Sequence, residues 1–143
     1  MPDTNVPFTV GRLWVLDAES GSARFVAEAD AGHGFKPAWS PEGTQLAFVA
    51  RANSDDLGAD WEDGKLISEI QIADLTRGTV SALTDIGEVR VEAPVWSPEG
   101  EFIAFGARTG GKDDVWMFDV ISRQLLPLTS GADARHPAWT AGD

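Results

Sequence analysis

The sequence predicts an all-β protein built from a repeated unit, and three observations support that prediction. The segment KPAWSPEGTQLAFVAR at residues 36–51 returns as APVWSPEGEFIAFGAR at residues 93–108. Its opening returns once more as HPAWT at residues 136–140. Compact apolar runs bounded by turn residues fill the chain, and no stretch of a dozen residues shows the helical period of about 3.6 residues.

The length of the repeat is typical of one particular all-β architecture. Trp39, Trp96 and Trp139 mark the same position in successive units and are 57 and 43 residues apart. The longer interval contains an insertion, ANSDDLGADWEDGK at residues 52–65, that the next unit lacks. Without it the period is about 43 to 45 residues, which is in the range of the blades of a β-propeller. The fixed place of the three tryptophans favours a structural role in packing between blades.

Each unit divides into four short strands, which we letter A to D. Strand A is PAWS or PVWS, and the following PEG supplies a turn because Pro fixes φ and Gly accepts a positive φ. Strand B is the apolar run TQLAFVAR or EFIAFGAR. Strand C ends on an aspartate in all three units, at Asp17, Asp74 and Asp119, and a hairpin turn leads to strand D.

These segments, in this order, resemble the TolB-like β-propeller repeat, a WD-like family. The likeness covers residues 8–140, although the usual Asp of the family's SPDG turn is Glu42 and Glu99 here. It implies a propeller that is commonly six-bladed and a non-catalytic scaffold for protein–protein interaction in the bacterial envelope. It therefore favours a periplasmic or extracytoplasmic location. Similar repeats also precede the hydrolase domain of prolyl-oligopeptidase-like peptidases, so the substrate-gating part of a larger enzyme is the alternative.

The strand count raises the question of how the ring closes. The chain reads as strands CD, ABCD, ABCD and A, and the segment NVPFTV would add a strand B before the first C if a tight turn formed at Gly11 and Arg12. The predicted blades are then 36–92, 93–136 and a split blade of 6–35 with 137–143. Three blades are too few for a ring of about four to eight. Either the chain is a piece of a longer propeller or, as we expect, two copies close one six-bladed ring as a homodimer.

The composition excludes several partners. The net charge is −12 with only 11 basic residues, so a nucleic-acid partner is not expected, because phosphate recognition needs clustered Lys and Arg. No apolar run reaches the roughly 20 residues of a membrane span, so membrane insertion is not expected either. The absence of cysteine excludes disulfides and leaves the compartment open. The remaining partner class is a protein or peptide, besides a second copy.

The insertion and two histidines are the remaining candidate sites. Asp60, Trp61 and Asp63 lie in an acidic stretch that is either a solvated loop, a calcium site or, with Trp61 as anchor, a partner contact. His33 and His136 each precede a strand A, at unequal distances from the next tryptophan, and we predict that both are partner contacts. A metal site, the alternative, would also need Asp30 or Asp133. We predict no metal and no cofactor. With no Cys, no Tyr and no GxSxG motif, we also predict no catalytic residues and no enzymatic activity.

Overall fold

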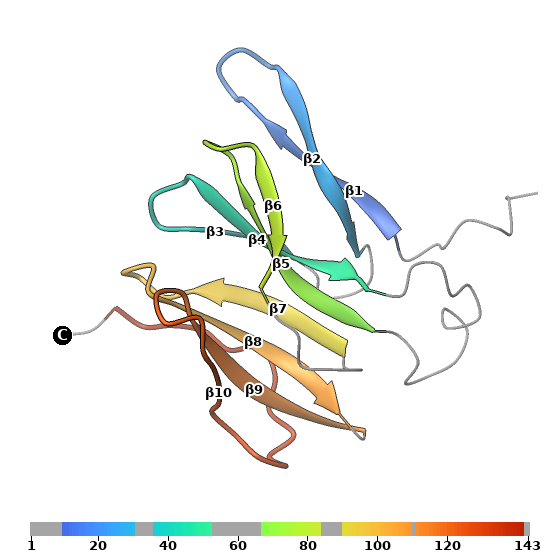
Figure 1. The fold of residues 1–143 in the computed structure, drawn as a ribbon, viewed down its shortest axis with the longest axis vertical. Helices are drawn as coiled ribbons and strands as arrows, with labels where there is room; N and C mark the ends of the chain where they lie inside the picture. The colour runs from blue at the N-terminus through green and yellow to red at the C-terminus, as the bar shows by residue number, and fades with distance from the viewer. Residues whose placement is uncertain (1–9, 31–35, 53–66, 84–89, 110, 142–143) are drawn as a thin grey trace, which may run out of the picture.

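The computed structural model describes residues 10–30, 36–52, 67–83, 90–109 and 111–141. These residues form ten β-strands and no helix, which confirms the predicted all-β class (Figure 1). The described part of the chain accordingly contains no helix that is long and apolar enough to cross a membrane.

The strands pair into three antiparallel sheets that follow chain order. Sheet 1 contains β1 (Val10–Leu16) and β2 (Ala23–Asp30). Sheet 2 contains β3 (Ala38–Trp39), β4 (Gln45–Arg51), β5 (Ser68–Asp74) and β6 (Thr79–Ala82). Sheet 3 contains β7 (Arg90–Trp96), β8 (Phe102–Thr109), β9 (Lys112–Asp119) and β10 (Leu125–Pro127). Sheets 2 and 3 are the four-stranded meanders that the sequence predicts, with strands A to D as spatial neighbours.

The three sheets stack face to face, with sheet 2 in the middle (Figure 1). One face of sheet 2 packs on sheet 3 through a cluster that includes Val49, Ile70 and Phe105. The other face packs on sheet 1 through Leu46 and Phe48, against Leu13 and Val15. This alternation gives sheet 2 two buried faces, so its strands B and C read as nearly continuous apolar runs.

Strand C of each sheet ends in the same aspartate turn. Oδ1 of Asp17, Asp74 and Asp119 accepts hydrogen bonds from the backbone N–H groups two and three residues further on, at 2.9–3.0 Å. These bonds lower the pKa of all three carboxyl groups, since they favour the charged form. A positive φ closes each turn, at Gly21, Gly78 and Arg123. The repeated aspartate is therefore explained by turn chemistry.

The SPEG segments form a second repeated turn. The N–H of Gly43 donates to the Ser40 carbonyl, and the N–H of Gly100 donates to the Ser97 carbonyl, both at 2.9 Å. The Ser40 and Ser97 hydroxyls accept the N–H groups that open strand B, at 3.1 and 3.0 Å. Glu42 and Glu99 are exposed at these turns.

The predicted turn at Gly11 and Arg12 is wrong. Both residues lie inside β1, where Gly11 pairs with Ala29 and Arg12 pairs with Glu28. The in-and-out alternation of β1 continues through them, because Gly11 lies on the buried side and Arg12 on the exposed side. A strand B for sheet 1 would have to lie before Val10, outside the described residues.

Candidate functional site

One contact between successive sheets occurs twice at equivalent positions. The indole Nε1–H of Trp96 in sheet 3 donates to the carbonyl of Ala38 in sheet 2, at 3.0 Å. The indole Nε1–H of Trp139 donates to the carbonyl of Val95 in sheet 3, at 3.2 Å. In both cases the acceptor is the residue directly before the tryptophan of the preceding unit. In these two places the tryptophan thus fixes the position of its own unit's strand-A segment relative to strand A of the preceding unit.

The segment at residues 134–140 follows the course that β7 takes in the preceding unit. His136 and Ala93 both have φ of 51° and both precede a proline, three residues before their tryptophans. Val91 N–H donates to Ser68 Oγ in β5 at 2.8 Å, and Ala134 N–H donates to the Asp113 carbonyl at the matching place in β9 at 2.8 Å. Trp139 also stacks on Phe102, with ring centroids 6.2 Å apart. Residues 134–140 therefore have the position and shape of a strand A, although they pair with no strand among the described residues.

Trp39 differs from the other two repeated tryptophans. Its side chain is 49% exposed, whereas Trp96 and Trp139 are partly buried. Trp39 pairs with Leu46 across β3 and β4, and Leu46 packs toward sheet 1, so both side chains lie on the face directed at sheet 1. Within the described part of sheet 1 there is no counterpart of β3 or β7. No described carbonyl therefore takes the role that Ala38 has for Trp96.

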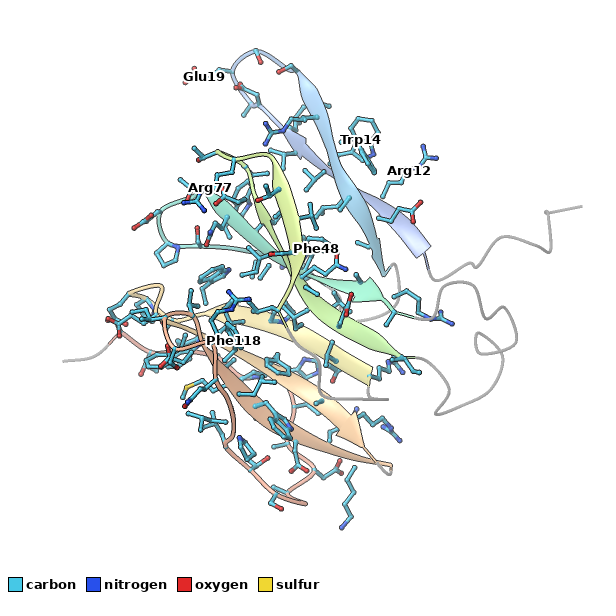
Figure 2. The ribbon with its side chains drawn as sticks, viewed as in Figure 1. Arg12, Trp14, Glu19, Phe48, Arg77 and Phe118 are labelled. Carbon is cyan, nitrogen blue, oxygen red and sulfur yellow. The ribbon has the colours of Figure 1, made fainter. Side chains whose placement is uncertain are left out.

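The outer face of sheet 1 is apolar and open. Trp14, Leu16 and Phe25 are 52%, 66% and 47% exposed, and Figure 2 shows Trp14 on the side of the hairpin away from sheet 2. Trp14 and Phe25 form an edge-to-face pair with centroids 5.6 Å apart. At the position of Leu16, directly before the turn aspartate, sheets 2 and 3 have Ala73 and Phe118, which are 1% and 2% exposed. The face that is buried in sheets 2 and 3 is therefore exposed in sheet 1.

The opposite end of the stack is partly covered by the segment that follows β10. The N–H groups of Leu128 and Thr129 donate to the Val115 carbonyl, at 2.9 and 3.3 Å. Arg135 Nε contacts buried Asp113 at 2.8 Å, and Arg108 approaches the same carboxylate oxygen at 3.4 Å. The Asp114 carboxylate accepts the N–H groups of Gly131 and Ala132, and these bonds lower its pKa. These contacts hold the chain leading to Trp139 in place.

Three buried serine hydroxyls are occupied by structural contacts. The hydroxyls of Ser40, Ser68 and Ser97 all bind backbone groups of neighbouring strands. Among the described residues no three His, Asp or Glu side chains are grouped so that they could hold a metal ion. A hollow of about 440 Å³ between β2 and β4 is lined, among the described residues, by Glu28, Arg51 and Gln71 beside apolar residues.

The predicted site residues fall into two groups. His33 and the insertion residues Asp60, Trp61 and Asp63 lie outside the described residues, so their role as a partner contact stays a prediction. His136 is exposed and has a left-handed backbone, and its place before Pro137 makes it part of the strand-A path. Sequence reasoning missed Ser68 and Ala93. Neither residue belongs to a motif that predicts its role, because Ser68 lies in no repeated segment and a residue before proline, such as Ala93, ordinarily favours an extended backbone.

Comparison with known proteins points to one family. No family model matches the chain. It is 30% identical over 80 residues to the Tol-Pal system protein TolB of Pseudomonas syringae, covering 55% of this chain and 18% of that protein. It is 42% identical over 50 residues to a TolB of Novosphingobium aromaticivorans, covering 34% of this chain and 11% of that protein. The chain matches less than a fifth of the length of these relatives.

Solved structures show the same fold. The structure of TolB from Acinetobacter baumannii superimposes with a TM-score of 0.60 at 21% identity, covering 82% of this chain and 26% of that one. The chain carries TolB-like β-propeller repeats. A prolyl endopeptidase superimposes with a TM-score of 0.69 at 16% identity, over 98% of this chain and 21% of that one. The fold of this chain thus resembles part of a prolyl endopeptidase as well as TolB, and at these identities the likeness shows the fold alone.

Proposed function

We propose that this TolB-like chain is a non-catalytic β-propeller scaffold for protein–protein interaction in the bacterial envelope. The observation that carries the proposal is the twice-repeated contact from tryptophan to carbonyl, which joins neighbouring sheets at equivalent positions, as expected of successive blades. The Tol-Pal relatives support the protein-binding role. The hydroxyls of Ser40, Ser68 and Ser97 bind backbone groups, which agrees with a scaffold. A periplasmic or extracytoplasmic location is part of the proposal, and the likeness to the same relatives supports it.

We further propose that the ring is completed by a second copy. Sheet 1, sheet 2 and sheet 3 would be three of six blades, and the open apolar face of sheet 1 is the kind of surface that marks an interface. Light scattering tests this directly, with an expected mass of about twice the 15.3 kDa of the chain. A monodisperse monomer at high concentration contradicts ring closure. Removal of residues 136–143 is expected to leave a monomer.

The protein-binding role is tested by the genomic neighbourhood and by titration. A scaffold of the Tol-Pal kind is expected beside a gene for an envelope lipoprotein, and isothermal titration calorimetry of the two purified proteins should report saturable binding. If the protein binds none of the products of the adjacent envelope genes, the proposal is contradicted.

A second candidate function is the substrate-gating propeller of a larger peptidase. The prolyl endopeptidase that superimposes over 98% of this chain is the observation that favours it. A reading frame that continues into a hydrolase domain would establish this alternative. The described residues would then still serve as a scaffold, since the catalytic groups would come from the other domain.

A further inference from the structure

We propose that Trp39 of one copy donates its indole N–H to the carbonyl of Ala138 in a second copy, and that residues 134–140 of that copy supply the strand A that the described part of sheet 1 lacks. This inference rests on the proposed ring of two copies and assigns the residues that join them.

The donors and acceptors of the repeated contact form two series of equal length. The donors are Trp39, Trp96 and Trp139, and the acceptors, each directly before a tryptophan, are Ala38, Val95 and Ala138. Within one copy Trp96 uses Ala38 and Trp139 uses Val95. Among the described residues this leaves one donor, Trp39, and one acceptor, Ala138.

These two groups cannot meet inside one copy. Trp39 lies on the face of sheet 2 that is directed at sheet 1. Ala138 lies beside Trp139, which packs on sheet 3 through Val95 and Phe102. Sheets 2 and 3 therefore stand between them (Figure 1). The unused donor and the unused acceptor lie at opposite ends of the stack, where two copies meet.

The strand-A segment is already shaped for this role. The left-handed residue, the proline and the tryptophan of residues 136–139 repeat those of residues 93–96. Ala138 is exposed, as expected of a strand whose outer neighbour comes from another chain. Sheet 1 has strands C and D, and in sheets 2 and 3 strand A lies on the opposite side of B from C. The occupant that fits the place in front of Trp39 is therefore this segment.

The faces that would adjoin also correspond. Leu16 is 66% exposed at the position where Phe118 of sheet 3 is 2% exposed against sheet 2. In the second copy, Met117 of sheet 3 would face this surface. Met117 is equivalent in sequence to Ile72, which packs in the cluster between sheets 2 and 3. The joint between copies would thus repeat the contact between sheets 2 and 3.

Cysteine pairs test the geometry, because the chain has no cysteine of its own. Ala38→Cys and Ala138→Cys chains are prepared separately, mixed and treated with a short thiol-specific cross-linker. The double variant Ala38→Cys with Val95→Cys, called the ruler below, is the positive control. Its two cysteines lie at equivalent positions in neighbouring units of one chain, each directly before a repeated tryptophan. We expect the ruler to cross-link internally and the mixture to give a covalent dimer. Neither single variant alone is expected to do so.

The outcomes separate this inference from the proposed ring. If light scattering reports a dimer and the ruler reacts, but the mixture gives no covalent dimer, the assignment of Ala138 to Trp39 is wrong and the ring stands. If the unmodified chain is a monomer, both are wrong. A covalent dimer in the mixture supports both.

The hydrogen bond itself is tested by Trp39→Phe, which keeps an aromatic ring and removes the N–H. We expect the dissociation constant of the dimer to rise by about tenfold for each of the two joints, because a carbonyl buried at the joint loses its donor. The matched control is Trp96→Phe, which removes the same bond inside the chain. It should lower the melting temperature and change the dissociation constant by less than about twofold. An unchanged dissociation constant for Trp39→Phe overturns the hydrogen bond.

Discussion

At the residue scale, the aspartate that ends each strand C acts through its charge. The carboxylates of Asp17, Asp74 and Asp119 are held by backbone N–H groups at the chain reversals, and hydrogen bonding to these groups lowers their pKa from the ordinary value of 3.8. A group whose pKa is lower in the folded state binds protons more readily when unfolded. Its contribution to stability is therefore present above pH 3.8 and is lost as the pH falls through the folded value.

The double substitution Asp74→Asn with Asp119→Asn should flatten this acid dependence. Asparagine keeps a side-chain oxygen that accepts the same N–H groups but does not titrate. The wild type is expected to lose more stability than the variant between pH 5 and pH 2, as measured by urea unfolding monitored by tryptophan fluorescence. Parallel curves for the two proteins would contradict the assignment of the lowered pKa values to these turns.

Ala93 offers a second prediction at this scale. Its φ of 51° lies in the left-handed region, where an L side chain is strained by about 1–2 kcal/mol. Replacing Ala93 by glycine should stabilise the fold by roughly 0.5–1 kcal/mol once the greater flexibility of unfolded glycine is subtracted.

The control is Ala82→Gly in the exposed strand β6, which lacks a positive φ. This substitution should destabilise by a similar amount. A loss of stability in both variants would show that the backbone at Ala93 is not strained.

At the element scale, the hairpin of β4 and β5 shows why an insertion is tolerated. Pairing continues in register to Arg51 and Ser68, and Ala52 N–H donates to the Ile67 carbonyl at 2.8 Å. The ends of the segment 53–66 are thus held together by the sheet. The equivalent strands β8 and β9 are joined by two residues after Thr109.

Replacing residues 53–66, which contain all of the predicted insertion except Ala52, by Gly-Gly should leave far-UV circular dichroism unchanged and the melting temperature within a few degrees. Shortening the loop changes the free energy of unfolding little, since the entropy of loop closure varies only with the logarithm of loop length. Aggregation of the shortened chain would show that the insertion packs into the core.

The elements differ in how well the sequence predicts them. The strands of sheets 2 and 3 follow from the repeat, and the aspartate and SPEG turns follow from side chains with one dominant local hydrogen bond. Gly11 was misassigned to a turn because glycine permits both a turn and an extended strand. The decisive features at Ala93 and His136 are backbone conformations of residues with no preference for them, so no side-chain pattern announces them.

At the scale of the whole molecule, two apolar clusters hold three sheets, and they should be separable by mutation. Phe105 is fully buried between sheets 2 and 3, and Phe48 is 1% exposed between sheets 1 and 2. Truncation to alanine removes a large side chain and leaves a cavity, at a cost of about 3–5 kcal/mol. Phe105→Ala should therefore unfold or strongly destabilise the whole chain.

Phe48→Ala should have a narrower effect. Sheet 1 has two strands and is joined to the rest through this cluster, so its amide protons should exchange faster while those of β8 and β9 stay protected. Hydrogen exchange followed by mass spectrometry measures both regions in one experiment. Equal loss of protection in all three sheets would show that the stack unfolds as one unit.

The two ends of the stack are unlike each other, so the association that we propose is directional. The end at sheet 1 offers Trp39 and an apolar face, and the end at sheet 3 offers the segment around Trp139. In the proposed ring, the end at sheet 1 of one copy meets the end at sheet 3 of the next, so the copies add head to tail. Such contacts produce a closed ring when the accumulated rotation reaches a full turn, and an open helical polymer when it does not. In the proposed assembly, the rotation between neighbouring sheets, set by the size of the side chains between them, therefore fixes how many copies close the ring. A conservative substitution between sheets 2 and 3 that keeps the fold but alters this rotation would change the number of subunits without touching either end.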